Sequence, residues 1–233
     1  MKFRVEKEVF DQLPDVCFGV VVAKNINNNQ AYPEINKLLM ENIQIAAQHF
    51  DGKKVKQDER ILPYREAFRT IGINPNKYLC SIEALFTRIA KGKSLPSINP
   101  IVDLGNAISL KYTLPLGAHD IDKGSEDICI RFSKEGDTFL PFGKEQEEKP
   151  DIGEVIYAVG NEVRTRRWTW RQSEHGKITN NSKNIFFPID GFLNFNKTQI
   201  IEARDELSDL LKEYFKCETI IGFVDKEHPE IEI

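Results

Sequence analysis

The residues best suited to binding chemistry are concentrated in one short stretch, residues 164–175. This stretch contains both tryptophans of the 233-residue chain together with four arginines. Guanidinium groups bind phosphate in a bidentate manner, and flat indole rings stack on bases or pack over cations. The composition of the stretch therefore predicts a site for a nucleotide or an RNA end.

In an extended backbone, the side chains of this stretch would alternate between two faces. One face would then carry Arg164, Arg166, Trp168, Trp170 and Gln172, and the other Thr165, Arg167, Thr169, Arg171 and Ser173. We expect Arg166 and Trp168 to point into a concave site and Thr165 and Arg167 to point away from it. The alternative is that both tryptophans belong to the core and that the arginines pair with surface carboxylates.

A second group of aromatic and arginine residues has helical spacing. Arg65 and Arg69 are i, i+4 neighbours beside two aromatic residues, so their side chains are expected on one face of a helix. They could hold an RNA phosphate, or they could pair with Glu66 and Glu83. The sequence leaves both interpretations open.

A row of small polar residues precedes an isolated histidine. Asn99 is followed by a proline, a pattern typical of a helix start, and the expected helix runs to about Leu110. Asn99, Asp103 and Asn106 would share one side of this helix, either as a solvated face or as the wall of a pocket. Because a short extended segment then leads to His119, we expect these four side chains to converge on one pocket.

The sequence predicts both strands and helices, and they do not alternate regularly along the chain. The predicted strands are residues 16–23, 128–132, 155–159 and 219–224. The other predicted helices run from Pro33 to about Phe50, from a Ser81 cap to about Gly92, and from an Asn196/Gln199 capping box to Lys216. We therefore predict an α+β fold. The absence of internal repeats and long linkers favours one domain over residues 1–233.

Composition and charge narrow the function classes. With 32 basic and 36 acidic residues the net charge is −4. We therefore expect neither general coating of nucleic acid nor DNA as a partner. A local basic site is still compatible with this net charge. The four cysteines are far apart, which is typical neither of a zinc site nor of a disulfide framework. The charged start and the short apolar runs favour a cytoplasmic protein without a membrane segment.

Common catalytic signatures are missing from the sequence. There is no Gly-x-Ser-x-Gly, no His-Glu-x-x-His, no Cys/His signature and no glycine-rich phosphate loop. We therefore expect neither a bound cofactor nor a metal. The sequence leaves the oligomeric state undetermined.

Several blocks of sequence occur in an order that is found in a known family. Two of them are Ile101-Val102-Asp103-Leu104-Gly105-Asn106 and Pro115-Leu116-Gly117-Ala118-His119-Asp120-Ile121-Asp122. The others are Tyr64-Arg65-x-Ala67-Phe68-Arg69, Gly72-x-Asn74-Pro75, Ser81-x-Glu83-Ala84-Leu85, Leu95-Pro96-x-Ile98-Asn99 and Arg166-Arg167-Trp168-x-Trp170-Arg171-Gln172. Together they resemble the editing domain of the beta chain of bacterial phenylalanyl-tRNA synthetase and, more closely, free-standing relatives of that domain.

The resemblance implies both a fold and an activity. In the synthetase this domain hydrolyses the ester of tRNA mischarged with tyrosine. The implied fold is a single α+β domain with a mixed or barrel-like β core flanked by helices. The implied function is trans-acting editing at the aminoacylated 3′ end of tRNA, without ligase activity in this chain. The alternative is a non-catalytic module that binds a tRNA end, a nucleotide or an amino-acid-like ligand.

The chain departs from the synthetase pattern at two positions. Gly117 stands where the synthetase has histidine, and His119 follows two positions later, roughly 6 to 7 Å further along an extended segment. Glu174 falls near the glutamate that recognises the tyrosine hydroxyl, but bulky polar residues precede it instead of glycines. The amino-acid specificity therefore does not carry over.

Hydrolysis of an aminoacyl ester requires a positioned water and donors for the developing oxyanion. The candidate catalytic residues are His119 and Asp120, with a hydrogen-bonded structural histidine as the alternative. The candidate substrate-binding residues are Asn99, Asp103, Asn106, Gly117, Ala118, Arg166, Trp168, Trp170, Gln172 and Glu174. The candidate RNA-binding residues are Arg65, Arg69, Arg167 and Arg171.

Overall fold

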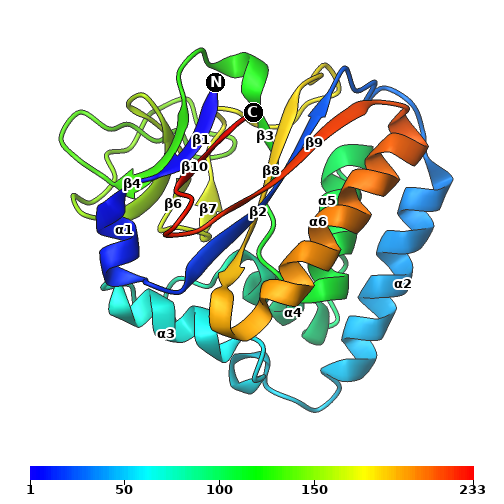
Figure 1. Cartoon of the computed structure of the whole chain (residues 1–233). Helices are drawn as coiled ribbons and strands as arrows, with labels where there is room; N and C mark the ends of the chain where they lie inside the picture. Colours follow the sequence, from blue (N-terminus) through cyan, green and yellow to red (C-terminus); the bar gives the residue numbers. More distant parts are fainter.

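Two β-sheets and a layer of helices make up the fold of this chain, as the computed structural model of residues 1–233 shows (Figure 1). The first sheet has six strands, in the order β10 (Glu230–Glu232), β1 (Lys2–Val5), β4 (Ile128–Phe132), β5 (Val155–Val159), β6 (Glu162–Arg166) and β7 (Arg171–Gln172). Strands β1 and β4 are parallel and the other neighbours are antiparallel. This sheet is therefore mixed.

The second sheet has four antiparallel strands, in the order β3 (His119–Asp120), β8 (Ile185–Phe192), β2 (Val16–Lys24) and β9 (Glu218–Val224). Neither sheet closes on itself, since each has two distinct edge strands. The fold class is α+β, as predicted, and the core is a pair of mixed and antiparallel sheets instead of a barrel.

The α-helices are α1 (Lys7–Gln12), α2 (Pro33–His49), α3 (Leu62–Thr70), α4 (Ser81–Ala90), α5 (Pro100–Tyr112) and α6 (Leu193–Phe215). Two short 3₁₀ helices are η1 (Val55–Gln57) and η2 (Ile121–Lys123). Helix α6 packs across β2, β8 and β9, and α5 packs against α6 and α2 (Figure 1). None of the helices combines the length and the apolar character needed to span a bilayer.

Strand β2 shows how the two cores arise. Every residue from Val16 to Ala23 is buried. Phe18 and Val20 belong to the core between the sheets, whereas Cys17 and Val21 belong to the core under α5 and α6. A strand that is buried on both faces needs a continuous apolar run instead of an alternating one. This confirms the strand predicted from that run.

Phe3 joins the two sheets. Its ring lies 5.8 Å from the ring of Phe18 and 4.8 Å from that of Phe186, both in the four-stranded sheet. It also stacks on Tyr157 of β5, at 6.2 Å between centroids. These aromatic contacts fix the separation of the sheets at the place where the candidate site lies.

Two predicted helix starts are corrected by the structure. The Asn99 cap is confirmed, because its Oδ1 accepts a hydrogen bond of 3.0 Å from the Val102 amide. Ser81, by contrast, is the first helical residue of α4, and the capping position before it makes no side-chain bond. The capping box does not form, since Asn196 Oδ1 accepts its bond from the Phe192 amide, but α6 does break at Asn196, the predicted start of the helix.

The bend in α6 has a clear cause. Asn196 has a φ of −137°, outside the helical range. Its Oδ1 accepts a 2.8 Å bond from the Phe192 amide, and its Nδ2 donates a 2.9 Å bond to Tyr64 Oη. The side chain thus ties the end of β8 to α3, which sequence spacing alone does not reveal.

Candidate functional site

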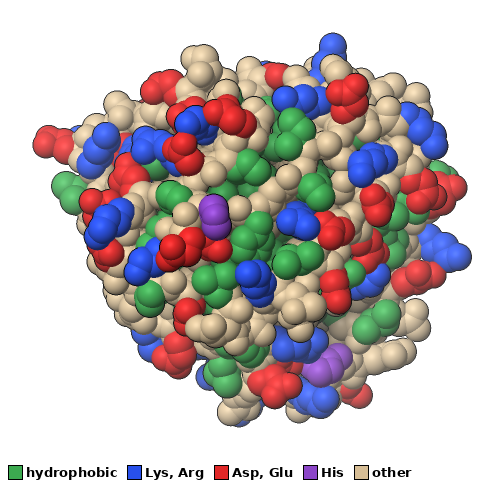
Figure 2. All heavy atoms as spheres, in the orientation of Figure 1, with side chains coloured by type: hydrophobic (Ala, Val, Ile, Leu, Met, Phe, Trp, Pro, Cys, Tyr) green, Lys and Arg blue, Asp and Glu red, His purple; other side chains and the backbone are tan.

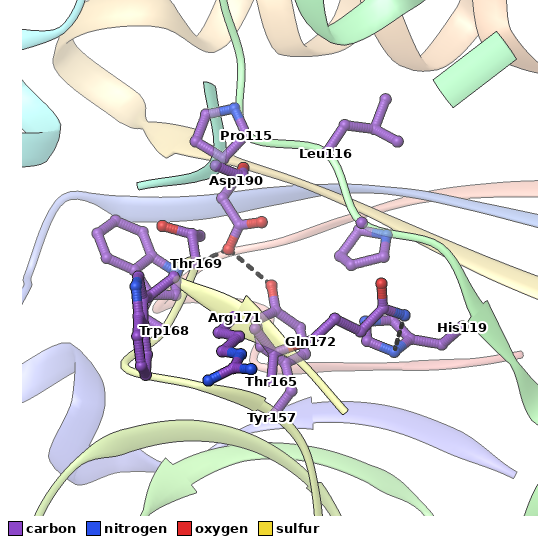
Figure 3. A pocket seen from close by; sticks show the side chains of 14 residues that line it. Pro115, Leu116, His119, Tyr157, Thr165, Trp168, Thr169, Arg171, Gln172 and Asp190 are labelled. Carbon is purple, nitrogen blue, oxygen red and sulfur yellow. Dashed lines mark hydrogen bonds between the residues drawn. The ribbon is translucent and has the colours of Figure 1, made fainter. Parts of the chain in front are cut away.

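A cavity of about 90 Å³, here called the inner cavity, lies where the edges of the two sheets meet (Figure 3). It is lined by the segment 115–119 that follows α5, by Pro188 and Asp190 of β8, by Tyr157 of β5, and by the turn that follows β6. Segments far apart in sequence therefore meet here. Polar and aromatic side chains converge in one small space, which is the usual character of a binding site.

Asp190 is the buried charge of this cavity. Its side chain is 2% exposed, and its Oδ1 accepts hydrogen bonds of 2.6 Å from Tyr157 Oη and from Trp168 Nε1. Burial raises the pKa of this carboxyl to about 7, against the opposing effect of the two hydrogen bonds. No ion pair compensates the charge, and Oδ2 accepts no bond from the protein. A perturbed carboxyl in a cavity is a typical functional group.

His119 lines the inner cavity, as predicted, but as a neutral ring. It is 3% exposed and stacks between Tyr157 and Phe186, at 5.8 and 6.1 Å between centroids. Burial lowers its pKa to about 3, and the charge of Arg164 acts in the same direction. The imidazole is therefore uncharged at neutral pH. Its Nδ1 lies 3.5 Å from Gln172 Nε2.

Gly117 separates the inner cavity from a second one. Its amide donates a 3.0 Å bond to the carbonyl of Pro188, which fixes the segment against β8. A Cβ at this position would lie 3.3 Å from His119 Nε2 and 3.3 Å from Pro188 Cγ. The missing side chain therefore keeps space open beside the imidazole. This is a structural reason for glycine where the synthetase pattern has histidine.

Thr169 adds an unpaired hydroxyl to the inner cavity. Its side chain is 6% exposed, and its Oγ1 has no hydrogen-bond partner in the protein. Its carbonyl accepts a 2.9 Å bond from the Ser81 amide, which ties the turn to the start of α4. A buried hydroxyl without a partner costs free energy unless a ligand or water satisfies it.

A second cavity of about 140 Å³, here called the outer cavity, adjoins the first. The two share Leu116, Gly117 and Gln172 as lining residues. Gln172 is anchored there by a 2.6 Å bond from its Nε2 to the carbonyl of Ala118. Each cavity is smaller than the roughly 300–1,000 Å³ of an ordinary small-molecule site. Each therefore suits one part of a larger ligand.

The arginine and tryptophan stretch forms a hairpin instead of one extended strand. Strand β6 ends at Arg166, and Arg167 and Trp168 have left-handed φ values of 47° and 59°. This turn breaks the two-residue alternation, so the predicted faces hold only in part: Trp168 lines the inner cavity and Arg167 does not, as predicted. Thr165, expected to point away, lines the inner cavity, and Arg166, expected to point into it, does not.

Arg166 and Arg167 share the buried carboxylate of Glu154. Arg166 donates bonds of 3.0 and 2.5 Å to Glu154, and Arg167 lies 2.7 Å from the same Glu154 and 2.8 Å from Asp151. The Arg167 guanidinium also lies 4.0 Å from the ring centroid of Tyr78. Both guanidinium groups are therefore committed to the fold. The alternative interpretation expected such pairing, but with surface carboxylates, whereas Glu154 is buried.

Trp168 and Trp170 differ in their surroundings. Trp168 is 1% exposed and belongs to the main core, and the edge of its indole reaches the inner cavity through its bond to Asp190. Trp170 is half-buried, lines the same cavity and packs edge-on against Tyr78. Both lie at the site, but only Trp170 has a solvent-accessible ring.

Arg171 is the exposed arginine at the inner cavity. Arg164, by contrast, is buried, with its Nη2 2.9 Å from Glu162. In the face shown in Figure 2, acidic and basic side chains are interspersed and no broad basic patch is present. A phosphate at the site would therefore meet a local charge and not an extended positive surface.

The two arginines of α3 have different roles. Arg65 is 4% exposed and donates bonds of 2.5 Å to Glu83 and 2.9 Å to the carbonyl of Pro75. Its predicted RNA contact is not compatible with this burial. Arg69 is exposed and paired with Glu66 on the same helix. Neither lines the inner or the outer cavity.

The predicted common pocket of the α5 residues and His119 is wrong. Asn99 caps the helix, and Asp103 accepts bonds of 2.5 Å from Ser97 Oγ and 2.9 Å from the Ile98 amide. Both line a separate surface depression, whereas Asn106 lines the outer cavity. The three side chains share one side of α5 but are spread along roughly 10 Å of its axis, so they line different depressions.

Asp120 and Glu174 also lie outside the two cavities. Asp120 accepts a 2.6 Å bond from Ser182 Oγ and a 3.0 Å bond from the Asp122 amide, and so caps η2. It is no partner for His119, because neighbouring residues of a strand point to opposite faces. Glu174 accepts a 2.8 Å bond from the Gly143 amide and lies 3.0 Å from Lys177.

Sequence reasoning missed Asp190 because it missed strand β8. The run from Ile185 to Phe192 is buried throughout and contains a single charged residue. That pattern, one carboxylate inside an apolar run, was the available signal, since an unpaired buried charge is costly and therefore points to function. No group of three or more His, Cys, Asp or Glu side chains is placed to hold a metal ion.

Residues 63–216 match the family model of the B3/4 domain. The match covers more than half of the chain, and the chain belongs to this family. A solved structure, the N-terminal fragment of the phenylalanyl-tRNA synthetase beta subunit from Pyrococcus horikoshii, is similar with 12% identity and a TM-score of 0.49. The alignment covers 92% of this chain and 49% of that chain, so this chain spans about half its length. No curated protein matches.

Proposed function

We propose that this protein is a trans-acting editing protein, which binds the aminoacylated 3′ end of tRNA and hydrolyses a mischarged aminoacyl ester. Membership of the B3/4 domain family supports the proposal. The observation that carries it is the free Oδ2 of Asp190, a carboxyl whose pKa is raised to about 7, in a cavity the size of a side chain. A general base works best when its pKa is close to the operating pH.

In this proposal the acyl group of the substrate enters the inner cavity. Asp190 Oδ2 accepts a proton from a water molecule as the water oxygen bonds to the ester carbonyl carbon. The carbon–oxygen bond to the ribose then breaks, and the proton passes to the ribose oxygen. The products are a free amino acid and a tRNA with its terminal hydroxyl restored.

The oxyanion that forms on the carbonyl oxygen requires a hydrogen-bond donor. We assign this role to the Thr169 hydroxyl, because Thr169 lines the same cavity and its Oγ1 bonds to no protein group. His119 acts here as a neutral wall, held by the rings of Tyr157 and Phe186. Arg171 supplies the exposed positive charge for a phosphate of the RNA end.

A panel of tRNAs, each mischarged with a different amino acid, tests this function. The expected result is catalytic release of at least one amino acid, with loss of release in Asp190→Asn. Asp209→Asn, an exposed carboxylate on α6, is the matched control and should keep full activity. Absence of release from every tRNA in the panel would refute the hydrolase.

A second function, binding without catalysis, is favoured by one observation. The imidazole of His119 is enclosed and its pKa is lowered to about 3, so the histidine expected to activate water is a weak base. A binding module would protect the ester against spontaneous hydrolysis and shift the tRNA in a gel. The panel separates the two, because protection and release are opposite changes in the same measurement.

A further inference from the structure

A group of exposed cations lies at the end of α4, away from both cavities. It comes from two segments, residues 53–56 at η1 and residues 88–93 at the end of α4, and neither segment contains a carboxylate. The rings of Phe50 and Phe86 pack at 4.8 Å between centroids, and η1 contacts α4, so the two segments lie side by side. The cations, here called the basic ridge, are Lys53, Lys54, Lys56, Arg88, Lys91 and Lys93.

The protein does not neutralise the basic ridge. None of its cations takes part in an ion pair, and the neighbouring Asp58 is engaged by His49 at 2.8 Å and by Arg60 at 2.9 Å. With all flanking acids counted, residues 51–60 and 88–93 hold seven basic and three acidic side chains, a local charge of +4 in a chain of net charge −4. An anionic partner therefore meets an attractive local field here.

Helix α4 connects the basic ridge to the inner cavity. Ser81, the first residue of this helix, lines the inner cavity, and Ala84 and Arg88 are exposed further along the same side. At 1.5 Å per residue, Arg88 and Lys91 lie roughly 10 and 15 Å along the helix from Ser81. The alanine between them presents only a methyl group. An extended ligand can therefore run from the inner cavity along α4 to the ridge.

We propose that the basic ridge binds the phosphate backbone of the RNA stem that adjoins the 3′ end, while the end itself enters the inner cavity. This inference rests on the proposed function and adds a partner surface to it. Nucleotides of one strand follow each other at about 3.4 Å along a double helix, so a span of roughly 15 Å corresponds to about four or five nucleotides. Such a contact positions the RNA without reading its sequence.

The composition of the basic ridge favours a phosphate backbone over a lipid surface. Val55 and Ile89, the large apolar residues of its two segments, are only 6% and 5% exposed. No large apolar side chain of these segments is therefore available to enter a bilayer, as interfacial anchors require. Arg88 Nε donates a 2.6 Å bond to the carbonyl of Ser94, which leaves both terminal nitrogens of the guanidinium for a phosphate.

Two triple variants that remove equal charge test the basic ridge. The ridge variant carries Lys53→Gln, Lys91→Gln and Lys93→Gln, and the control carries Lys134→Gln, Lys216→Gln and Lys226→Gln, three exposed lysines outside the ridge and both cavities. The RNA is a hairpin with a short single-stranded 3′ overhang. The ridge variant should reduce the slope of log affinity against log salt by about 2 to 3, since each phosphate contact contributes about 0.7 to 0.9. The control should keep the slope of wild type.

The overhang alone, as a short single strand, is the second RNA. It should bind wild type and the ridge variant equally, because it is too short to reach the basic ridge. Equal slopes for the two triple variants on the hairpin, or equal weakening of hairpin and overhang, would overturn the inference. Loss of binding to vesicles of anionic lipid, with hairpin binding intact, would assign the ridge to a membrane instead. If the triple variant melts early, Lys93→Gln alone should still lower the slope by about 0.7 to 0.9.

Failure of this inference and failure of the proposed function give different results. If the ridge variant loses the stem contact but wild type hydrolyses no ester, the basic ridge stands and the hydrolase is wrong. If wild type hydrolyses an aminoacylated hairpin and the ridge variant does so with the same kcat/KM, the hydrolase stands and the ridge is wrong. Aminoacyl-adenosine, which has no stem, should be hydrolysed equally by both proteins.

Discussion

Tyr157 Oη donates a 2.6 Å hydrogen bond to Oδ1 of Asp190, and Trp168 Nε1 donates a second bond of the same length to the same oxygen. Both protein donors therefore serve one oxygen of the carboxyl, and Oδ2 is left for a water or a ligand (Figure 3). The bonds also fix the rotamer of the aspartate. The orientation required of a general base is thus built before any substrate arrives.

The first prediction concerns the pH dependence of hydrolysis. Ester hydrolysis should rise with pH until Asp190 is ionised and level off above about pH 7, the pKa of this carboxyl. Asp190→Asn should lower the rate by roughly 10²- to 10⁴-fold and remove this inflection. Tyr157→Phe removes a bond that favours the charged form, so the inflection should move to higher pH. A profile that Tyr157→Phe leaves unchanged would count against Asp190 as the base.

The second prediction is a pair of opposite effects on stability. Because the pKa of Asp190 is raised to about 7, its contribution to the free energy of unfolding is present below about pH 4 and is lost as the pH rises to 7. Asp190→Asn should therefore gain stability relative to wild type over this range, by up to about 4 kcal/mol.

The pKa of His119 is lowered to about 3, so its contribution has the reverse sign. It is present above about pH 6.5 and lost as the pH falls towards 3. His119→Gln should therefore flatten the acid side of the stability profile. Urea titrations of wild type and both variants between pH 4 and pH 8 measure the free energy of unfolding. The change caused by each substitution should vary with pH in opposite directions for the two variants. Variation in the same direction would contradict one of the two pKa shifts.

The third prediction separates the exposed arginines. Arg171→Ala should weaken tRNA binding and reduce the slope of log affinity against log salt by about one, the loss of one phosphate contact. Arg69→Ala removes an equally exposed guanidinium that lines neither cavity, and should leave the slope unchanged. Filter binding at several salt concentrations gives both values. Identical slopes for the two variants would remove Arg171 from the RNA contact.

The fourth prediction treats Arg166 as a structural residue. Arg166→Ala leaves Glu154 buried with only Arg167 as its cationic partner. Loss of one partner of a buried pair should lower the free energy of unfolding by about 3 kcal/mol. The salt dependence of tRNA binding should stay that of wild type. A reduced salt slope without a change in the melting temperature would restore Arg166 to the RNA-binding residues.

The fifth prediction concerns Gly117. Its φ lies outside the left-handed region, so alanine brings no backbone strain, but its Cβ would press on His119 and Pro188 at 3.3 Å. Gly117→Ala should therefore lower ester hydrolysis by roughly 10²-fold through misplacement of the acyl group. Unchanged hydrolysis with a normal melting curve would show that no substrate atom lies beside Gly117.

The strands and helices with strong periodic patterns could be predicted from the sequence. Strand β2 and the Asn99 cap of α5 are examples, because their signals are local. The hairpin after β6 could not be predicted, since non-glycine residues with left-handed φ at Arg167 and Trp168 are uncommon. The turn places Trp168 on the same side as Thr165 instead of on that of Arg166, so Thr165 and Trp168 line the cavity together. Local alternation is reliable only where the backbone stays extended.

The candidate site was predicted in part for the same reason. His119, Gln172 and the tryptophans lie in segments with visible motifs, and they do meet at the inner cavity. Asp190 comes from β8, which pairs with β2 and β3 across large sequence separations. Its raised pKa depends on burial by these distant strands, which no local pattern encodes.

Strand β1 pairs with β10, so that Lys2 lies opposite Glu232 at one edge of the six-stranded sheet (Figure 1). Partners so far apart in sequence meet only after a large loss of chain entropy. Folding rates fall as the mean sequence separation of contacts grows. Pairings between distant segments, of which β1 with β10 has one of the largest separations, are therefore expected to slow the folding of this protein.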